Sequence, residues 1–216
     1  MSKSATLACR EQFRTPAQQR ETASVGMWIF LANEVMMFGA LFTAYTVYRA
    51  SHPQAFDIGS ADMNIMLGSI NTALLLTSSL MLSFAEHSAQ AGNRRLIALF
   101  LILTMIIGAV FLGLKFTEYY QHFQEHKAPG VWFNDSSPYA NSIQMFFVFY
   151  FIMTGLHAVH MIIGIGILAG LLFRTIIGTM TAEYHTPILF GGLYWHFVDI
   201  VWIFLYAIFY LPGLHL

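Results

Sequence analysis

The sequence predicts an all-α integral membrane protein, built as a bundle of five transmembrane helices. Of the 216 residues, 57% are hydrophobic and only 10% are charged, a profile that is typical of membrane proteins and not of soluble domains. Five apolar stretches each reach the length of about 20 residues that crosses the hydrocarbon of a bilayer. The last of them, 193–211, also carries two ionisable side chains, His196 and Asp199.

The N-terminal residues 1–24 are predicted to form a polar tail on the cytoplasmic side. They lack the apolar middle region of a cleavable signal peptide, so we expect the tail to be retained. The single cysteine, Cys9, lies in this tail, which excludes a disulfide framework and cysteine-based zinc or iron–sulfur sites within the chain. The net charge of −1 and the absence of a basic run with interleaved aromatics exclude nucleic-acid binding.

The remaining residues, 25–216, are predicted to form one transmembrane domain without a second domain or an internal repeat. Short linkers containing Gly, Pro or Asn separate the apolar stretches, as helix-breaking residues do. Small residues at four-residue spacing, Gly166 with Gly170 and Ala109 with Gly113, predict close approach of helix backbones. The expected spans are 25–48, 63–86, 96–119, 143–173 and 190–211.

The distribution of Lys and Arg predicts the orientation of these spans. With five spans, the N-terminal tail and the second and fourth loops share one side of the membrane. That side holds Lys3, Arg10, Arg14, Arg20, Arg94, Arg95 and Arg174, whereas the other holds Arg49, Lys115 and Lys127. Because cytoplasmic loops are enriched in Lys and Arg, the N-terminus is expected in the cytoplasm and the C-terminus outside.

Ionisable side chains inside three predicted spans are the candidate functional residues. At 1.5 Å per residue, those of the first and fifth spans lie about 9 to 14 Å from the cytoplasmic ends of their helices, and the pair on the fourth span also lies in the cytoplasmic half. Asn71 on the second span lies a little further out. Burying such groups in hydrocarbon is costly, so they normally face protein or water and mark function. The candidates are Glu34, His157, His160, His196 and Asp199.

Three interpretations of these residues remain open from their pattern. His196 and Asp199, three residues apart on one helix face, are consistent with a polar pair that hydrogen-bonds to itself and to a neighbouring helix. Glu and His in a dry site are equally consistent with a proton relay, because burial readily shifts their pKa values. A metal site is disfavoured, since the five residues show no recognised ligand spacing.

Five sequence motifs resemble subunit III of the haem-copper terminal oxidases. The match is to the short form with five helices, which lacks the first two helices of the seven-helix form. The fourth and fifth motifs are the most specific. In chain order the motifs are WIFLANEVMMFGALF, GSINTALLLTSS, LGLKFTEYYQ, TGLHAVHMIIG and YWHFVDIVWIFLY.

The resemblance implies a non-catalytic subunit of a proton-pumping respiratory complex in aerobic electron transport. Haem and copper are then expected on partner subunits and not on this chain, which would contact subunit I, in a complex with subunit II, and bind phospholipids. The resemblance implies support of subunit I during turnover and of proton uptake. Glu34 matches the buried carboxylate of the family that reacts with carbodiimides, and Arg174 matches an arginine associated with lipid. Ser24 departs from the pattern, because many relatives have Arg there; Arg20 lies about one turn earlier.

The oxidase branch is indicated by two features. Glu34 in the first span and the tyrosine-rich end of the fifth favour a cytochrome c oxidase, located in the inner membrane of a bacterium. A quinol oxidase subunit III and the accessory subunit of a nitric oxide reductase are alternatives with the same helix number. A stand-alone proton or ion transporter is the alternative of a different class, disfavoured because inverted repeats and helices broken at matched positions are absent from the sequence.

Overall fold

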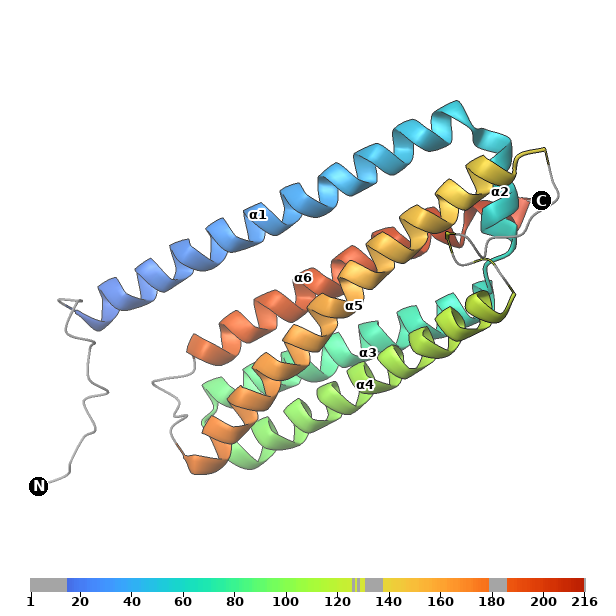
Figure 1. Ribbon diagram of the computed structural model, residues 1–216. Coiled ribbons are helices and arrows are strands. Elements are labelled where there is room, and N and C mark those ends of the chain that lie inside the picture. Colours follow the sequence, from blue (N-terminus) through green and yellow to red (C-terminus); the bar gives the residue numbers. More distant parts are fainter. Residues whose placement is uncertain (1–14, 126, 128, 131–137, 179–185, 216) are drawn as a thin grey trace, which may run out of the picture. The chain divides into compact units, whose positions relative to one another are not determined.

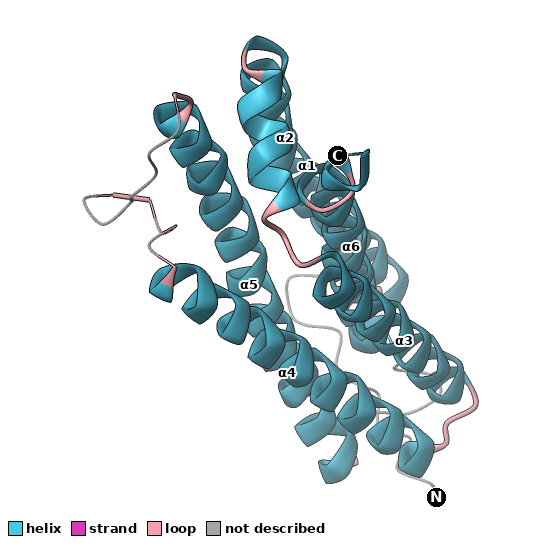
Figure 2. Cartoon of the chain, turned by 90° about the vertical axis from the view of Figure 1, so that its right-hand side faces the viewer, coloured by secondary structure: helices cyan, strands magenta, loops and turns pink. Residues whose placement is uncertain are grey.

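The computed structural model describes residues 15–125, 127, 129–130, 138–178 and 186–215. Within these ranges every regular element is a helix (Figure 1, Figure 2). The elements are α1 Pro16–Ser51, α2 Pro53–Ala61, α3 Ile65–Gln90, α4 Arg94–Gln124, α5 Ala140–Ile177, α6 Thr186–Phe209 and the short 3₁₀ helix η1 Pro212–His215.

The five predicted spans are confirmed as long apolar helices: α1, α3, α4, α5 and α6 each have the length and composition to cross a membrane. Most of the helices extend beyond the apolar stretches that mark them. α1 begins at Pro16, nine residues before the predicted start, and α5 continues to Ile177. Hydropathy identifies only the part that meets hydrocarbon, whereas backbone hydrogen bonding continues through polar residues until a turn residue ends it.

Asparagine and glycine set three of these ends. The side chains of Asn64 and Asn93 accept hydrogen bonds from the backbone N–H of Leu67, at 3.1 Å, and of Leu96, at 3.4 Å. Each therefore caps the first turn of the helix that follows, α3 or α4. α5 ends at Gly178, whose φ of 87° is left-handed, a conformation that glycine adopts without a steric penalty.

Helix α2 is a difference from the prediction, which treated the residues between the first two spans as a linker. Pro53 occupies its first turn, where the missing N–H costs nothing and the fixed φ favours a helix. With nine residues it is too short to span a bilayer. Its buried side, which includes Phe56 and Ser60, packs against α5 and η1.

The chain divides into two units, residues 1–37 and 38–216, so α1 contributes to both. In the second unit, α3 packs against α4 and α6, and α5 packs against the same two helices (Figure 2). Ser69 pairs with Tyr206, and Ser79 with His196, so α3 and α6 run antiparallel. The centre of this unit is filled by fully buried aromatic side chains, including Phe111, Trp195 and Trp202.

Glycines other than the predicted ones pack closely against a neighbouring helix, and they meet a side chain of that helix. A Cβ at Gly108 or Gly164 would lie 2.8 or 3.0 Å from the ring of Trp195, so these two glycines make room for that side chain. At Gly113, Gly166 and Gly170 nothing in the described part of the chain lies within 4 Å of such an atom. The spacing of small residues alone did not show which of them face a bulky neighbour.

The end of α6 is fastened to α1 and α2 by hydrogen bonds to its last carbonyl groups. The Tyr45 hydroxyl donates to the Ile208 carbonyl at 2.8 Å, and the Ser60 hydroxyl donates to the Phe209 carbonyl at 2.7 Å. The Ser60 oxygen also accepts from the backbone N–H of Gly213 at 2.9 Å. Carbonyls that the helix itself leaves unpaired are thus satisfied by side chains.

Candidate functional site

The six predicted residues are divided between the two units of the chain. Glu34 lies on α1 within the unit 1–37, whereas the two pairs on α5 and α6 belong to the unit 38–216. Arg174 is exposed in the last turn of α5. Five of the six residues therefore belong to the unit 38–216, and the four of them on the inner parts of α5 and α6 contact different neighbours.

His157 and His160 both lie on the buried side of α5, as predicted, but in different surroundings. The His157 ring is 1% exposed and packs 5.7 Å from Phe111 and 5.3 Å from Trp202. Neither of its nitrogens makes a hydrogen bond to a described residue. Nδ1 of His160 instead lies 2.8 Å from the carbonyl oxygen of Leu156, one turn earlier on the same helix.

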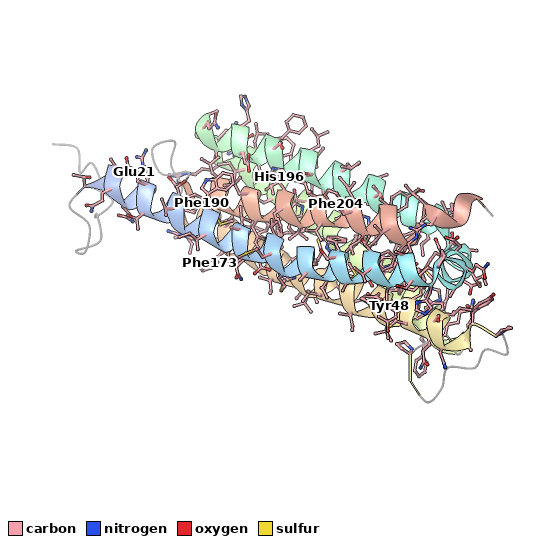
Figure 3. The ribbon with its side chains drawn as sticks, turned by 90° about the horizontal axis from the view of Figure 1, so that it is seen from above. Glu21, Tyr48, Phe173, Phe190, His196 and Phe204 are labelled. Carbon is pink, nitrogen blue, oxygen red and sulfur yellow. The ribbon has the colours of Figure 1, made fainter. Side chains whose placement is uncertain are left out.

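His196 and Asp199 do not hydrogen-bond to each other in the structure, so they do not form the self-bonded pair that was one interpretation of their spacing. Nδ1 of His196, labelled in Figure 3, lies 2.6 Å from the hydroxyl oxygen of Ser79 on α3. Its Nε2 lies 3.8 Å from Oε1 of Glu86. Asp199 is 4% exposed, and neither of its carboxyl oxygens has a hydrogen-bond partner among the described residues. The three-residue spacing predicted that His196 and Asp199 share one helix face, but it could not predict which residues of the neighbouring helices each would contact.

Glu86 was not predicted as a site residue, because it stands at the end of an apolar stretch where charged residues usually mark the membrane surface. The structure turns its side chain toward α6, where its carboxylate occupies the space that a Cβ at Gly192 would fill. Gly192 near the start of the last apolar stretch, a residue without a side chain to fill the space beside it, was the only signal in the sequence. Glu86, His196 and Ser79 are called the His196 chain below.

A second group, the Lys115 cluster, was also missed. It consists of Lys115 and Glu118 on α4, Tyr150 on α5 and Tyr210 just after α6. Nζ of Lys115 donates to Oε2 of Glu118 at 2.8 Å and to both tyrosine hydroxyls at 2.9 Å. The Tyr210 hydroxyl donates to the other Glu118 oxygen at 2.6 Å. The motif LGLKFTEYYQ contained the pair, but its tyrosine partners come from distant parts of the chain.

The Lys115 cluster is closed to solvent and internally satisfied. Lys115 and Glu118 are each 2% exposed. The ammonium group also lies 4.8 Å from the centre of the Tyr150 ring and 5.1 Å from that of Trp202, within the range of cation–π attraction. A buried ion pair is stable only when hydrogen bonds complete its coordination, as they do here.

Hydrogen bonds join several of the ionisable groups in the described bundle. In the part of the chain that the structure describes, three or more His, Cys, Asp or Glu side chains nowhere gather as a metal site requires. The groups that share an environment are instead joined in pairs and chains, through a serine or tyrosine hydroxyl. Hydroxyl groups both donate and accept, so they connect ionisable groups without holding charge themselves.

The comparison with protein families identifies the family to which this helix bundle belongs. The family described as Cytochrome c oxidase subunit III matches residues 11–214, almost the whole chain. The chain belongs to the cytochrome c oxidase subunit III family. The match includes all five candidate spans, so the resemblance seen in the motifs is confirmed.

Relatives in the family come from two kinds of oxidase. The chain is 30% identical to a cytochrome c oxidase subunit 3 from Thermostichus vulcanus, covering 87% of this chain and 86% of that protein. It is also 30% identical to a quinol oxidase subunit 3 from Bacillus subtilis, with coverage of 88% and 87%. A longer relative, a cytochrome c oxidase subunit 3 from Scyliorhinus canicula, is 32% identical over 87% of this chain and 69% of its own length. Sequence identity alone does not assign the chain to one of these two kinds of oxidase.

Proposed function

We propose that this chain is the non-catalytic subunit III of a proton-pumping cytochrome c oxidase in the inner membrane of a bacterium. It contacts subunit I, which carries the chemistry, within a complex that includes subunit II, and it supports proton uptake and the stability of subunit I during turnover. The observation that carries the proposal is the family match over residues 11–214 on a chain with five apolar spans. The excess of Lys and Arg in the N-terminal tail and in the second and fourth loops supports a cytoplasmic N-terminus.

Haem and copper are proposed to lie on the partner subunits. The family match supports this, because the chain belongs to the family of subunit III and the resemblance places haem and copper on other subunits. Purification of the chain in mild detergent tests the whole proposal. An oxidase subunit is expected to bring a haem-containing complex with it, whereas a colourless protein on its own would favour the stand-alone transporter. Stoichiometric iron, copper or zinc in the separated chain would contradict the proposal for the metals.

Cytochrome c is the proposed electron donor to the complex. Glu34 in the first span and the tyrosines Tyr206 and Tyr210 at the end of the last support this choice over a quinol. The purified complex is expected to consume oxygen with reduced cytochrome c and not with a quinol. The reverse preference would make the chain a quinol oxidase subunit while leaving its place in the family unchanged.

Arg174 is proposed to hold a phospholipid phosphate. It lies exposed in the last turn of α5, and a guanidinium at the membrane surface can bind a phosphate with two hydrogen bonds. Arg174→Ala is expected to lower the phospholipid retained by the purified complex and to shorten its active lifetime, with a normal initial rate. Arg95→Ala, which removes an exposed arginine from α4, is the matched control. An unchanged lipid content in the Arg174 variant would contradict lipid binding, and Arg174 would then only mark the cytoplasmic side of the membrane.

Glu34 is proposed to support turnover without carrying obligatory protons. Glu34→Gln keeps the shape and most of the hydrogen bonding of the side chain, so assembly and nearly full oxygen consumption are expected. Glu34→Ala removes both and strands any partner, at a cost of about 1–3 kcal/mol, so faster inactivation or weaker association with subunit I is expected. A haem-replete Gln variant that consumes no oxygen would make Glu34 an essential proton carrier instead.

A further inference from the structure

The His196 chain connects one surface of the membrane with a carboxyl group in its interior. Glu86 lies four residues before the end of α3, about 6 Å along the helix axis, so it stands near the membrane surface. Asp199 lies 13 residues after the start of α6, about 20 Å along that helix, near the middle of the bilayer. His196 and Ser79 lie between these two carboxyl groups.

The end of the His196 chain near the membrane surface is partly exposed, whereas the end at Asp199 is buried. The side chains of His196 and Glu86 are 30% and 22% exposed, and Glu86 stands near the end of α3, where water is available at the membrane surface. Ser79 is bonded to Nδ1 of His196 at 2.6 Å. Asp199 follows His196 by three residues on the same face of α6, the face that meets Ser79 of α3, and neither of its carboxyl oxygens has a hydrogen-bond partner among the described residues.

Asp199 is the unexplained group in this arrangement. A carboxyl group without a hydrogen bond inside a helix bundle is costly, and native proteins rarely keep one without a role. The other titratable groups of the bundle include Glu86 on α3, a group on α4, the two histidines of α5 and His196 on α6 itself. The group on α4 consists of Lys115, Glu118 and His122. Lys115 is already paired with Glu118. Ser79 is therefore the described route by which a proton can pass between Asp199 and an exposed group.

We propose that Glu86, His196 and Ser79 form a proton-transfer site that exchanges the proton of Asp199 with the membrane surface. A proton from water binds the Glu86 carboxylate and passes to Nε2 of His196, in the tautomer that holds its proton on Nδ1. His196 then gives the Nδ1 proton to the Ser79 oxygen, while Ser79 gives its hydroxyl proton to Asp199. One proton has moved inward, Ser79 is again a neutral hydroxyl and His196 is neutral with its proton on Nε2.

Infrared spectroscopy of the purified complex tests this proposal. The C=O band that disappears in Asp199→Asn identifies the protonated carboxyl of Asp199, and transfer to D₂O shifts that band as its proton exchanges. In the parent chain the shift is expected within the mixing time. In Ser79→Ala and Glu86→Gln the exchange is expected to slow at least tenfold. Ser83→Ala removes an exposed hydroxyl one turn further along α3 and is the matched control, with an unchanged rate.

Each outcome decides the proposal. Unchanged exchange in both variants overturns it, and so does the absence of an Asp199 C=O band at every pH tested. Should Ser79→Ala fail to assemble, Glu86→Gln carries the same test, and Ser79→Thr, which retains the hydroxyl, is expected to exchange at the parent rate. The measurement goes beyond the proposed function and does not depend on it, because a preparation without haem would refute that function and still report the exchange of Asp199.

Discussion

The bundle buries polar groups in two opposite ways. The Lys115 cluster, where α4 and α5 meet the residue that follows α6, pairs each of its charged groups with several partners. In the middle of the bundle, Asn71, His157 and Asp199 are as deeply buried and make no hydrogen bond to a described residue. A satisfied network rigidifies the helices it joins, whereas unsatisfied groups cost stability and persist where they serve another purpose.

The positions of the two groups fit this difference. The Lys115 cluster joins residues that are far apart in the chain, including Lys115 and Tyr210, 95 positions apart. Of the unsatisfied groups, His157 lies between the large aromatic rings of Trp202 and Phe111. The Lys115 cluster therefore fixes how the helices pack against one another. The unsatisfied groups instead leave buried hydrogen-bonding atoms in apolar surroundings without a partner among the described residues. The following variants measure that contrast.

The largest effect is expected from breaking the buried ion pair. Glu118→Leu leaves the Lys115 ammonium buried without its counter-charge, a loss of about 3–5 kcal/mol in the free energy of unfolding. Adding Lys115→Met is expected to recover much of this loss, because replacing both members of a buried pair with apolar side chains is often nearly neutral. Unfolding in mixed detergent micelles measures both. If Glu118→Leu alone is as stable as the parent, the Lys115 cluster does not anchor the helices.

A smaller loss is expected from removing one hydroxyl of the cluster. Tyr210→Phe deletes the hydrogen bond to Glu118 and the one from Lys115, both involving charged groups, so a loss of about 1–3 kcal/mol is expected. Tyr206→Phe, one turn earlier, deletes an exposed hydrogen bond to Ser69 and serves as the control, with a loss below about 1 kcal/mol. Equal losses would remove the distinction between the buried cluster and the surface.

The opposite result is expected in the middle of the bundle. Asn71→Leu replaces an unsatisfied amide with an apolar side chain of similar size, so stability is expected to change by less than about 1 kcal/mol or to rise. Thr72→Val, the next residue, strands the indole N–H of Trp202 that its hydroxyl accepts at 3.1 Å, a loss of about 1–3 kcal/mol. If Asn71→Leu lowers the free energy of unfolding more than Thr72→Val does, the Asn71 amide makes a stabilising hydrogen bond.

The smallest effect is expected at the surface, where Lys127 pairs with Asp62 at 3.3 Å and Glu125 at 3.1 Å. Partial burial lowers the pKa of Lys127, but the two carboxylates outweigh it and hold that pKa above its ordinary value. Its contribution is therefore complete below the unfolded pKa of about 10.4 and is lost as the pH rises through the folded value. Lys127→Ala is expected to cost about 0.2–1 kcal/mol, equally at pH 6 and pH 9, and less in high salt. A cost that varies between these two pH values would contradict this assignment.

The sequence predicted the membrane helices well because hydrophobic length is a local property. Residues 96–119 already contained most of α4, whereas its extension to Gln124 and the cap at Asn93 needed the backbone hydrogen bonds. The polar residues were harder. Lys115 counted as a basic residue of the outer side, yet the structure buries it, because the tyrosines that receive it lie 35 and 95 positions away. Glu86 similarly read as a boundary residue until α6 placed Gly192 opposite it.

The one-turn spacing of Lys115 and Glu118 also bears on how the chain is made. The two residues pair within α4 itself, so this helix carries its own counter-charge before any other helix is present. A lysine alone in hydrocarbon costs several kcal/mol, and a neighbouring carboxylate reduces that cost during synthesis and insertion. The tyrosines of α5 and of the segment after α6 arrive later and complete the coordination. A charge pair that the finished bundle uses as an anchor thus first serves to let a single helix enter the membrane.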